Sequence, residues 1–511
     1  MAAEDETPSQ RKRRRPPGPE APNTAGISQP IRNGLPPLNF LTADQVEQIH
    51  TASLSILART GVTVTSDDAL DVYARGGARV NRAARRVYLD PALIAHALSS
   101  APERYTLHSR NPANDIIIGG EYCAVMPAGG PPYVRDLNGV RRPGTLADVE
   151  NFTRVSAVSP EVHVLARKAV EAQDVPVAIR HLECWRAVLL LSDKPVTSGF
   201  VGGRPEAEDA LQMLAALFGG ESALDGHPVA QCNINVNSPL LYDKAMVEGL
   251  LAFARLGQPV IITPFVMAGV MGPATLAGAL AQHNAEVLAG VVLAQMVRPG
   301  TPVVYGTATS NTDLRSGAPA IGSPESAISV GVCAQMARHY RLPCRGGGAL
   351  TDSPIPDAQS NYERMLLLMT SVLSGVNFVM HGLGILESYL TVCYEQFVID
   401  LELIAMLREL VRPLEINAET LALDTINDVG PGGFFLDAPH TLRHHRHAHF
   451  LPNISQRLPY DQWVAAGRQD AAQRANARCR ELLAAYVPPP VDPAAAARLE
   501  AFVEKRQAEL V

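Results

Sequence analysis

The chain lacks the features that mark secreted, membrane and nucleic-acid-binding proteins. Its N-terminus has no apolar stretch like that of a secretory signal, and no run of 18 apolar residues is free of charge, so we expect neither export nor a membrane span. The seven cysteines form no CxxC pair, and their odd number indicates reduced, mostly buried thiols in a cytoplasmic protein. Only 19% of residues are charged and the formal net charge is -7, which argues against nucleic acid as the main partner.

Hydrophobic residues make up 47% of the 511 positions, enough for one large domain or two ordinary ones. Residues 1–36 are instead rich in proline, glycine and charge, so we expect a solvated, disordered leader, with order beginning near Leu41. A nuclear-localisation or nucleic-acid role for the basic run at 11–15 is the less favoured alternative. We expect an α/β cap over about 37–120, a main domain over 121–410 and a C-terminal helical part over 411–511.

Within the main domain, short apolar runs alternate with longer helical patterns. Units of roughly 30–40 residues with parallel-type strands indicate either a doubly wound sheet or a (β/α)8 TIM barrel. No G-x-G-x-x-G follows the first strand, which removes the main argument for a Rossmann sheet, so we predict the barrel. The expected strands are 122–127, 162–166, 195–201, 229–236, 260–267, 302–307, 344–349 and 376–382.

In such a barrel the functional groups lie where strands end and the following loops begin. Those positions carry aromatic, thioether and neutral polar side chains with few charges, which suits a methylated ammonium ligand that binds ring faces. Phe265 and Met267 could equally be barrel core. The side chains at the strand ends are Phe200, Asn235, Asn237, Phe265, Met267, Tyr305, Thr307, Leu350, Asp352 and His381.

The segment 346–363, GGGALTDSPIPDAQSNYE, carries the strongest functional signal. Three glycines end an apolar strand, a loop of small residues follows, and Asp357 opens a helix. The segment resembles the site of the trimethylamine:corrinoid methyltransferase family, in which a pyrrolysine precedes an S/T-D-x-x-x-P-D-x-Q run. Leu350 stands at the position of that pyrrolysine. The chain is therefore identified as a member of the non-pyrrolysine branch, whose relatives demethylate quaternary amines such as glycine betaine.

Further motifs occur in the order of the same family, and the similarity extends over about residues 38–508. They are HNAEVLAG at 283–290, YGT at 305–307, GSPE at 322–325, VGPGG at 429–433 and HTLR at 440–443. Each motif is weak alone, and their order and spacing carry the resemblance, which also points to the barrel.

The resemblance implies an enzyme that moves a methyl group from a quaternary amine, such as glycine betaine, to the Co(I) corrinoid of a cognate partner protein. The corrinoid (cobalamin) belongs to that partner, and no cofactor is expected to be bound permanently by this chain. A quaternary nitrogen leaves as a neutral amine, so no pyrrolysine is needed at Leu350. Two alternatives stay open: a non-catalytic, betaine-binding regulatory barrel and a methyltransferase with a tetrahydropterin acceptor. A homo-oligomer is compatible with the sequence, which does not specify one.

Site roles follow from the strand ends and the resemblance together. Leu350, Glu286 and Tyr305 are the catalytic candidates. For Glu286 a structural ion pair or cap is the open alternative, because a carboxylate among apolar residues is costly to bury unless it is paired. Candidate substrate-binding residues are Phe265, Asn235, Asn237, Asp352 and His381, with Arg345 a further donor for a betaine carboxylate. Loops at Gly346, Gly347, Gly348 and Gly382 are expected to face the corrinoid.

Two other groups of polar residues are not expected to belong to the site. The histidines at 440, 444, 445, 447 and 449 suggest zinc, but no cysteine or carboxylate stands at ligand spacing with them, so no metal is expected. Asp400 and Glu402 are expected on a solvated or interdomain face of a helix.

Overall fold

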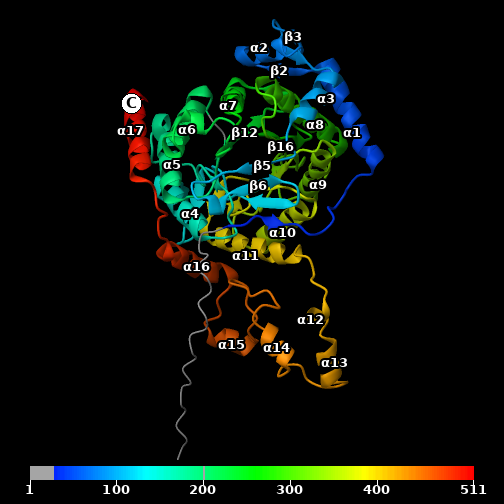
Figure 1. Ribbon diagram of the computed structural model, residues 1–511, viewed down its shortest axis with the longest axis vertical. Helices are drawn as coiled ribbons and strands as arrows, with labels where there is room; N and C mark the ends of the chain where they lie inside the picture. The colour runs from blue at the N-terminus through cyan, green and yellow to red at the C-terminus, as the bar shows by residue number, and fades with distance from the viewer. Residues whose placement is uncertain (1–27, 200–201, 511) are drawn as a thin grey trace, which may run out of the picture.

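The computed structural model describes residues 28–199 and 202–510, and its centre is a barrel of eight parallel strands (Figure 1). The strands lie side by side in the order β10-β11-β12-β14-β16-β19-β20-β7. The carbonyl of Val125 in β7 accepts hydrogen bonds from the amides of His163 and Val164 beside β10, which closes the circle. The bounds are β7 Tyr122–Val125, β10 Leu165–Ala166, β11 Val196–Gly199, β12 Ala230–Val236, β14 Val260–Pro264, β16 Val303–Gly306, β19 Cys344–Gly347 and β20 Phe378–Met380. The predicted (β/α)8 barrel is confirmed.

Eight helices follow these strands and form the outer ring. They are α4 Leu146–Val158, α5 Val177–Leu191, α6 Arg204–Phe218, α7 Lys244–Arg255, α8 Leu276–Val297, α9 Pro324–His339, α10 Ala358–Leu373 and α11 Tyr394–Leu410. By length and composition α8 could cross a membrane, the one such helix in the described part of the chain. However, 83% of its apolar window is buried inside the protein, as in a core helix.

An antiparallel hairpin fills the N-terminal end of the barrel. Its strands are β5 (Arg104–Leu107) and β6 (Ile116–Gly119), and both are drawn across the centre of Figure 1. Their buried side chains pack with inward-facing residues such as Ile261 and Phe378. The hydroxyl of Tyr105 donates to Gln231 Oε1 at 2.6 Å, near the start of β12. The opposite end, where each strand ends and the loop that follows it begins, is here called the mouth.

Loops at the mouth build two small sheets. One joins β21 (Ile385–Leu386), β22 (Thr391–Cys393), β8 (Tyr133–Arg135) and β9 (Arg141–Pro143). The other joins β15 (Met267–Ala268), β17 (Ser310–Thr312) and β18 (Pro319–Ala320). These sheets fix loops that would otherwise be free to move over the mouth.

The N-terminal elements pack on the outside of the barrel, chiefly against α8. The Tyr73 hydroxyl donates to the Ala289 carbonyl at 2.9 Å, and β2 pairs in parallel with β13 from the loop after β12. These elements are α1 Ala43–Ser55, β2 Val62–Val64, α2 Asp67–Arg75, β3 Arg79–Asn81, β4 Arg86–Tyr88, α3 Pro91–Ser100 and β13 Leu241–Tyr242.

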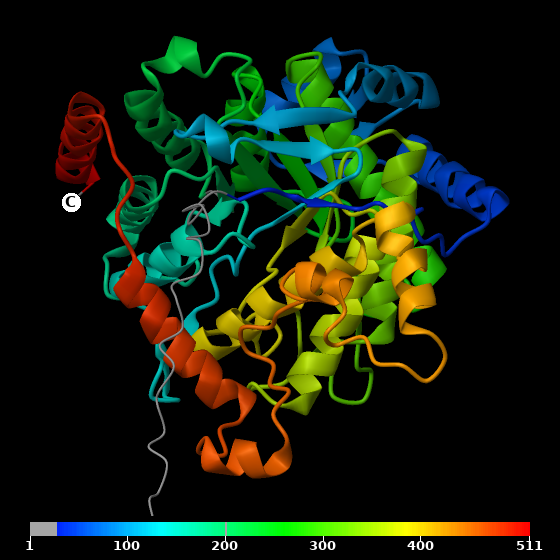
Figure 2. The ribbon, with the colours of Figure 1, turned by 60° about the horizontal axis from the view of Figure 1, so that its bottom comes forward.

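The C-terminal part contains helices that pack on the barrel and a segment that leaves it. Helix α16 (Ala471–Ala485) packs on α11 and α4, and α17 (Pro493–Leu510) packs on α5 and α6. Between α11 and α16, residues 412–470 project away from the barrel and are here called the arm (Figures 1 and 2). The arm contains α12 Ala418–Leu421, α13 Leu423–Val429, α14 Pro439–His444 and α15 Tyr460–Ala465.

Order begins earlier than the expected Leu41. Strand β1 (Ile31–Arg32) pairs antiparallel with β7, and Ile31 is buried. The Asn33 side-chain amide donates to the Val372 carbonyl at 2.8 Å. Residues 28–36 are therefore part of the folded body, whereas the disorder expected for residues 1–27, including the basic run, lies outside the described residues.

A buried ion pair joins α10 to α11. Arg364 and Asp400 are both fully buried, and Arg364 Nη1 lies 2.8 Å from Asp400 Oδ2. Burial raises the pKa of Asp400 to about 6, against the opposing effect of Arg364. Of the two expected settings, the solvated face was wrong, because both carboxylates are buried and accept hydrogen bonds inside the protein. Glu402 accepts them from three backbone amides of the C-terminal part.

We predict different effects for two N-terminal truncations. Removing residues 1–27 should leave the free energy of unfolding unchanged, as their composition suggests. Removing residues 1–36 should lower it by about 2–4 kcal/mol, because the buried Ile31 side chain and the β1–β7 hydrogen bonds are lost. Urea denaturation of the two truncated proteins beside the full chain measures this, and equal midpoints for all three would contradict it.

We predict that Arg364→Met lowers the free energy of unfolding by about 3–5 kcal/mol, because it leaves the Asp400 carboxylate buried without its partner. The double variant Arg364→Met/Asp400→Asn should recover much of this loss, since an amide costs less to bury than an unpaired carboxylate. Glu363 is the residue before Arg364 on the same helix, and Glu363→Gln provides a control. If the single and double variants unfold at the same denaturant concentration, the ion pair is not the cause.

Candidate active site

A cavity of about 230 Å³ opens at the mouth of the barrel. Its lining comes from the ends of β12, β14 and β19 and from the loops after β7, β16 and β20. This is the position at which TIM barrels bind and transform their ligands. The lining residues are Gly129, Gly130, Pro131, Asn235, Thr263, Phe265, Ala308, Arg345, His381, Ile385 and Tyr389.

Arg345 places a positive charge in this cavity, and no carboxylate of residues 28–199 or 202–510 pairs with it. Its side chain comes from β19, is 2% exposed, and donates from Nη1 to the Thr307 carbonyl, while Nε has no hydrogen-bond partner among the described residues. Burial lowers the pKa of Arg345 to about 10, and the neighbours that oppose this shift are Tyr389 and Cys344 rather than a carboxylate. A buried cation with unused donors is costly unless an anion joins it, so the cavity is suited to an anionic group.

Asn235 adds a neutral donor to the same wall. Its Oδ1 accepts from Asn233 Nδ2 at 3.1 Å, and Asn233 Oδ1 accepts in turn from the Thr263 hydroxyl at 2.7 Å. Asn233 and Asn235 point to the same side because residues two apart on a strand share a face, and Thr263 meets Asn233 from the neighbouring strand β14. With its oxygen occupied, Asn235 presents its Nδ2 amino group to the cavity.

His381 is held neutral. Its Nδ1 accepts a hydrogen bond from the Gly129 amide at 3.2 Å, and burial lowers its pKa to about 3, with Arg345 adding to the effect. The residue has a φ of 57°, a left-handed conformation that is uncommon outside glycine. The ring meets Tyr389 edge to face at 5.1 Å. His381 therefore offers the cavity an Nε2–H donor without a second charge.

Tyr389 ends a run of three left-handed residues, with φ of 51°, 49° and 76° at Glu387, Ser388 and Tyr389. Such conformations cost of order 1–3 kcal/mol each and persist only where neighbours enforce them. Asp352 does so here: it accepts from the Ser388 hydroxyl and from the amides of Ile321 and Gly322. Asp352 thus lies outside the cavity lining and braces the loop that presents Tyr389.

The cavity combines two kinds of recognition. Arg345, Asn235 and His381 supply hydrogen-bond donors, and Phe265 and Tyr389 supply aromatic rings. Donors with one positive charge bind a carboxylate, and ring faces attract an alkylated ammonium group. A molecule with both groups, a small zwitterion, matches this lining.

Two predicted catalytic residues point elsewhere. Leu350 is 4% exposed and packs in the main hydrophobic core, outside the cavity lining among the described residues. Tyr305 is fully buried, and its hydroxyl donates to Asn284 Oδ1 at 3.0 Å on α8. Because Val304 before it faces the barrel interior, Tyr305 must face the helices.

Glu286 and Asn237 also lie outside the cavity lining. Glu286 is fully buried in α8 and accepts from the Ser238 hydroxyl at 2.6 Å, the Leu240 amide at 2.7 Å and Gln282 Nε2 at 3.0 Å. Burial raises its pKa to about 7. The structure supports the alternative of a structural role, in which Glu286 fixes the loop after β12. Asn237 is exposed and donates to Asp243 Oδ2.

The glycines expected to face the corrinoid are buried. A Cβ on Gly348 would lie 2.6 Å from the Gly382 Cα, so the backbones after β19 and β20 touch at this point. A Cβ on Gly346 would meet the side chains of Val376 and Val330. The burial of Gly346, Gly347, Gly348 and Gly382 thus reflects close backbone packing behind the cavity. Phe200 lies outside the described residues.

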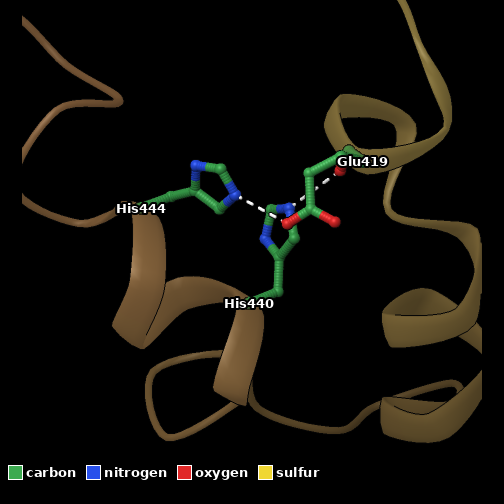
Figure 3. A group of neighbouring side chains, drawn as sticks. All are labelled: Glu419, His440 and His444. Atoms are coloured by element: carbon green, nitrogen blue, oxygen red, sulfur yellow. Dashed lines mark hydrogen bonds and ion pairs between the residues drawn. The ribbon is translucent and has the colours of Figure 1, made fainter.

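The histidine-rich segment of the arm forms a polar cluster (Figure 3). His444 Nε2 lies 2.9 Å from Glu419 Oε1, His440 Nε2 lies 3.0 Å from the Glu419 carbonyl, and Arg443 donates to the same Oε1 at 3.0 Å. The three ligand atoms of Glu419, His440 and His444 lie within 4.8 Å of one another, close enough for a metal ion. Sequence spacing missed Glu419 because it is 21 residues before His440. The arginine already occupies its carboxylate, and these bonds tie α14 to α12.

Comparisons with known proteins agree with this geometry. The profile of the family described as Trimethylamine methyltransferase (MTTB) matches residues 8–511. The chain is 43% identical to the glycine betaine methyltransferase of Desulfitobacterium hafniense (strain Y51), over 93% of this chain and 98% of that protein.

Two further relatives carry related names. The trimethylamine methyltransferase MttB of Desulfitobacterium hafniense (strain DSM 10664 / DCB-2) is 34% identical, over 91% of this chain and 93% of that protein. The proline betaine:corrinoid methyltransferase of Eubacterium limosum is 30% identical, over 88% of this chain and 94% of that protein. With a family match over nearly its whole length and a mouth cavity that pairs a buried cation with aromatic rings, this chain belongs to the trimethylamine methyltransferase family.

Proposed function

We propose that this chain transfers a methyl group from a quaternary ammonium carboxylate, with glycine betaine the leading candidate, to the Co(I) corrinoid of a partner protein. The observation that carries the substrate assignment is Arg345, a buried cation in the cavity whose Nε donor is unused and whose described neighbours include no carboxylate. The carboxylate of a betaine supplies the missing anion. The similarity to the betaine methyltransferases of Desulfitobacterium hafniense and Eubacterium limosum supports the same class.

The substrate is held at both ends. Its carboxylate accepts from Arg345, with Asn235 and His381 as neutral donors beside it. Its methylated nitrogen then lies against the rings of Phe265 and Tyr389, where a diffuse positive charge is stabilised without a formal anion. A full counter-charge near the nitrogen would hold the substrate more tightly than the transition state, in which that charge disappears.

The chemistry needs positioning more than acid or base catalysis. The corrinoid, when its partner protein is docked, supplies a Co(I) nucleophile that accepts the methyl group. The C–N bond breaks with its electron pair going to nitrogen, so a neutral tertiary amine leaves and no proton moves. This chain fixes the methyl group in line and excludes water, which accounts for a lining of rings and amides.

The partner is proposed to dock over the mouth, because the cobalt must reach the methyl group. The loops of the mouth carry exposed apolar side chains at Val140, Val270, Leu314 and Leu390, which supports contact with another protein. Val270 and Leu314 lie in loops of the sheet β15–β17–β18, where Leu314 also contacts Gly269, and Val140 and Leu390 lie in loops of the sheet β21–β22–β8–β9. Both sheets therefore contribute to this rim.

We predict methyl transfer to free cob(I)alamin from glycine betaine and weaker transfer from choline, which lacks the carboxylate. Trimethylamine should give none, because its amine would have to leave as a poor anion and Leu350 cannot form an activating adduct. Loss of cob(I)alamin absorbance together with the demethylated amine measures the reaction. Trimethylamine-dependent turnover at the rate of glycine betaine would refute the proposal, and so would betaine binding without any methyl transfer, as a regulatory barrel would show.

We predict that Arg345→Gln lowers kcat/KM for glycine betaine at least about 30-fold, because removing one partner of a buried charge pair costs about 2–5 kcal/mol. Activity with choline should fall less than threefold. The control is Asn237→Ala, since Asn237 stands two residues beyond Asn235 on the same chain segment but lies outside the cavity lining. An equal loss for both substrates would show that Arg345 does not read the carboxylate.

A further inference from the structure

The arm has almost no core of its own. Within residues 412–470, all of them described, Ala438 and Ile454 are the two buried residues, and Ile454 lies where backbone amides of the arm bind Glu402 on α11. Helices α12, α13 and α14 have only four, seven and six residues. Helices this short are unstable in water unless an amphipathic face packs against something else. The arm's helical structure therefore requires a surface that covers it.

Large apolar side chains are concentrated on the arm. Of the 28 exposed large hydrophobic residues in the described chain, 12 lie between residues 414 and 460, and each of these is at least 44% exposed. A monomer rarely leaves such a concentration in water, which marks the arm as an interaction surface. The most exposed are Leu414, Ile416, Phe434, Leu436, Leu451 and Tyr460.

A second uncovered apolar surface lies on α10. Tyr362, Leu366 and Met369 are 64%, 37% and 36% exposed. Their spacing of four and three residues places them on one face of the helix, here called the α10 face. An amphipathic helix of a barrel normally turns polar residues outward, so this stripe also indicates a covered surface.

The arm begins beside the segment that leads to the α10 face. The Gly34 amide donates to the Val411 carbonyl at 3.1 Å, next to the first residue of the arm. Four residues later the Leu38 amide donates to the Leu373 carbonyl at the end of α10. A twofold axis near this root would bring the arm of one copy onto the α10 face of another, and the same contact would form twice.

We propose that the chain forms a twofold homodimer in which the arm of each copy covers the α10 face of the other. Twelve large, half-exposed apolar side chains can supply on the order of the 800 Å² per partner that a stable interface buries. The arm carries five Lys/Arg and seven Asp/Glu, so no strong charge opposes contact with an identical chain. The α10 face lies on the side of the barrel, whereas a corrinoid must enter at the mouth, which favours a second copy as the occupant.

Cysteine cross-linking tests the arrangement directly. All seven natural cysteines are buried, so an introduced exposed thiol is the reactive one. Chains carrying Phe434→Cys and Leu366→Cys are co-expressed with different affinity tags, purified through both tags and treated with a short bismaleimide. We expect a covalent species of twice 54.7 kDa from this pair. The control replaces Leu366→Cys with Val177→Cys, an exposed site on α5, and should give no such species.

Sedimentation of the unmodified protein provides the second measurement. We expect a dimer at micromolar concentration, and Leu436→Asp in the arm or Leu366→Asp on α10 should each weaken dimerisation at least tenfold while the methyl-transfer rate per chain stays within twofold. A monomeric wild type overturns the proposal. So does a dimer that cross-links through Val177→Cys instead, or a link formed within one chain by the Phe434→Cys/Leu366→Cys double variant.

Discussion

The ion pair between Arg364 and Asp400 holds together the part of the barrel on which the cavity depends. Arg364 Nη1 also donates to the Ala349 carbonyl at 2.6 Å, and Asp400 Oδ2 also accepts from the Gly384 amide at 2.7 Å. One charge pair therefore clamps the loops after β19 and β20, which follow Arg345 and His381. The Ala349 carbonyl and the Gly384 amide each add a hydrogen bond to this buried pair, so the loops and the pair stabilise each other.

The cavity in front of this clamp is arranged at a cost in stability. Arg345 is desolvated without a counterion in the described part of the chain, and His381 and Tyr389 keep left-handed backbones. These features do not favour folding, and the surrounding packing must enforce them. A bound ligand offsets this cost in free energy. An anion pairs with the buried charge of Arg345, and a ligand placed between the rings needs no rearrangement of the loop. Such preorganisation reduces the entropy lost when a flexible, solvated substrate is positioned.

The barrel could be predicted because short-range sequence patterns indicate where strands and helices alternate. The same patterns mark the strand ends, which is how Asn235, Phe265 and His381 could be placed at the mouth. Features that depend on distant partners could not. Strand β1 exists because Ile31 pairs with Cys123, and the role of Glu286 depends on Ser238, 48 residues away. Tyr389 was missed because the three successive residues with positive φ are not glycines, so the sequence gives no sign of the turn that points Tyr389 at the cavity. Tyr305 was misplaced for a different reason: the alternation with Val304 could have shown that it faces outward.

The hairpin β5–β6 that fills the N-terminal end of the barrel has a kinetic consequence. Under the proposed function, the substrate and the corrinoid protein share this one opening, and a docked partner blocks it. A betaine must enter before the corrinoid protein arrives, and the tertiary amine can leave only after that protein departs. The proposed reaction then has a fixed order of binding, and the time that the partner spends on the rim sets an upper limit on its turnover, however fast the methyl group itself moves.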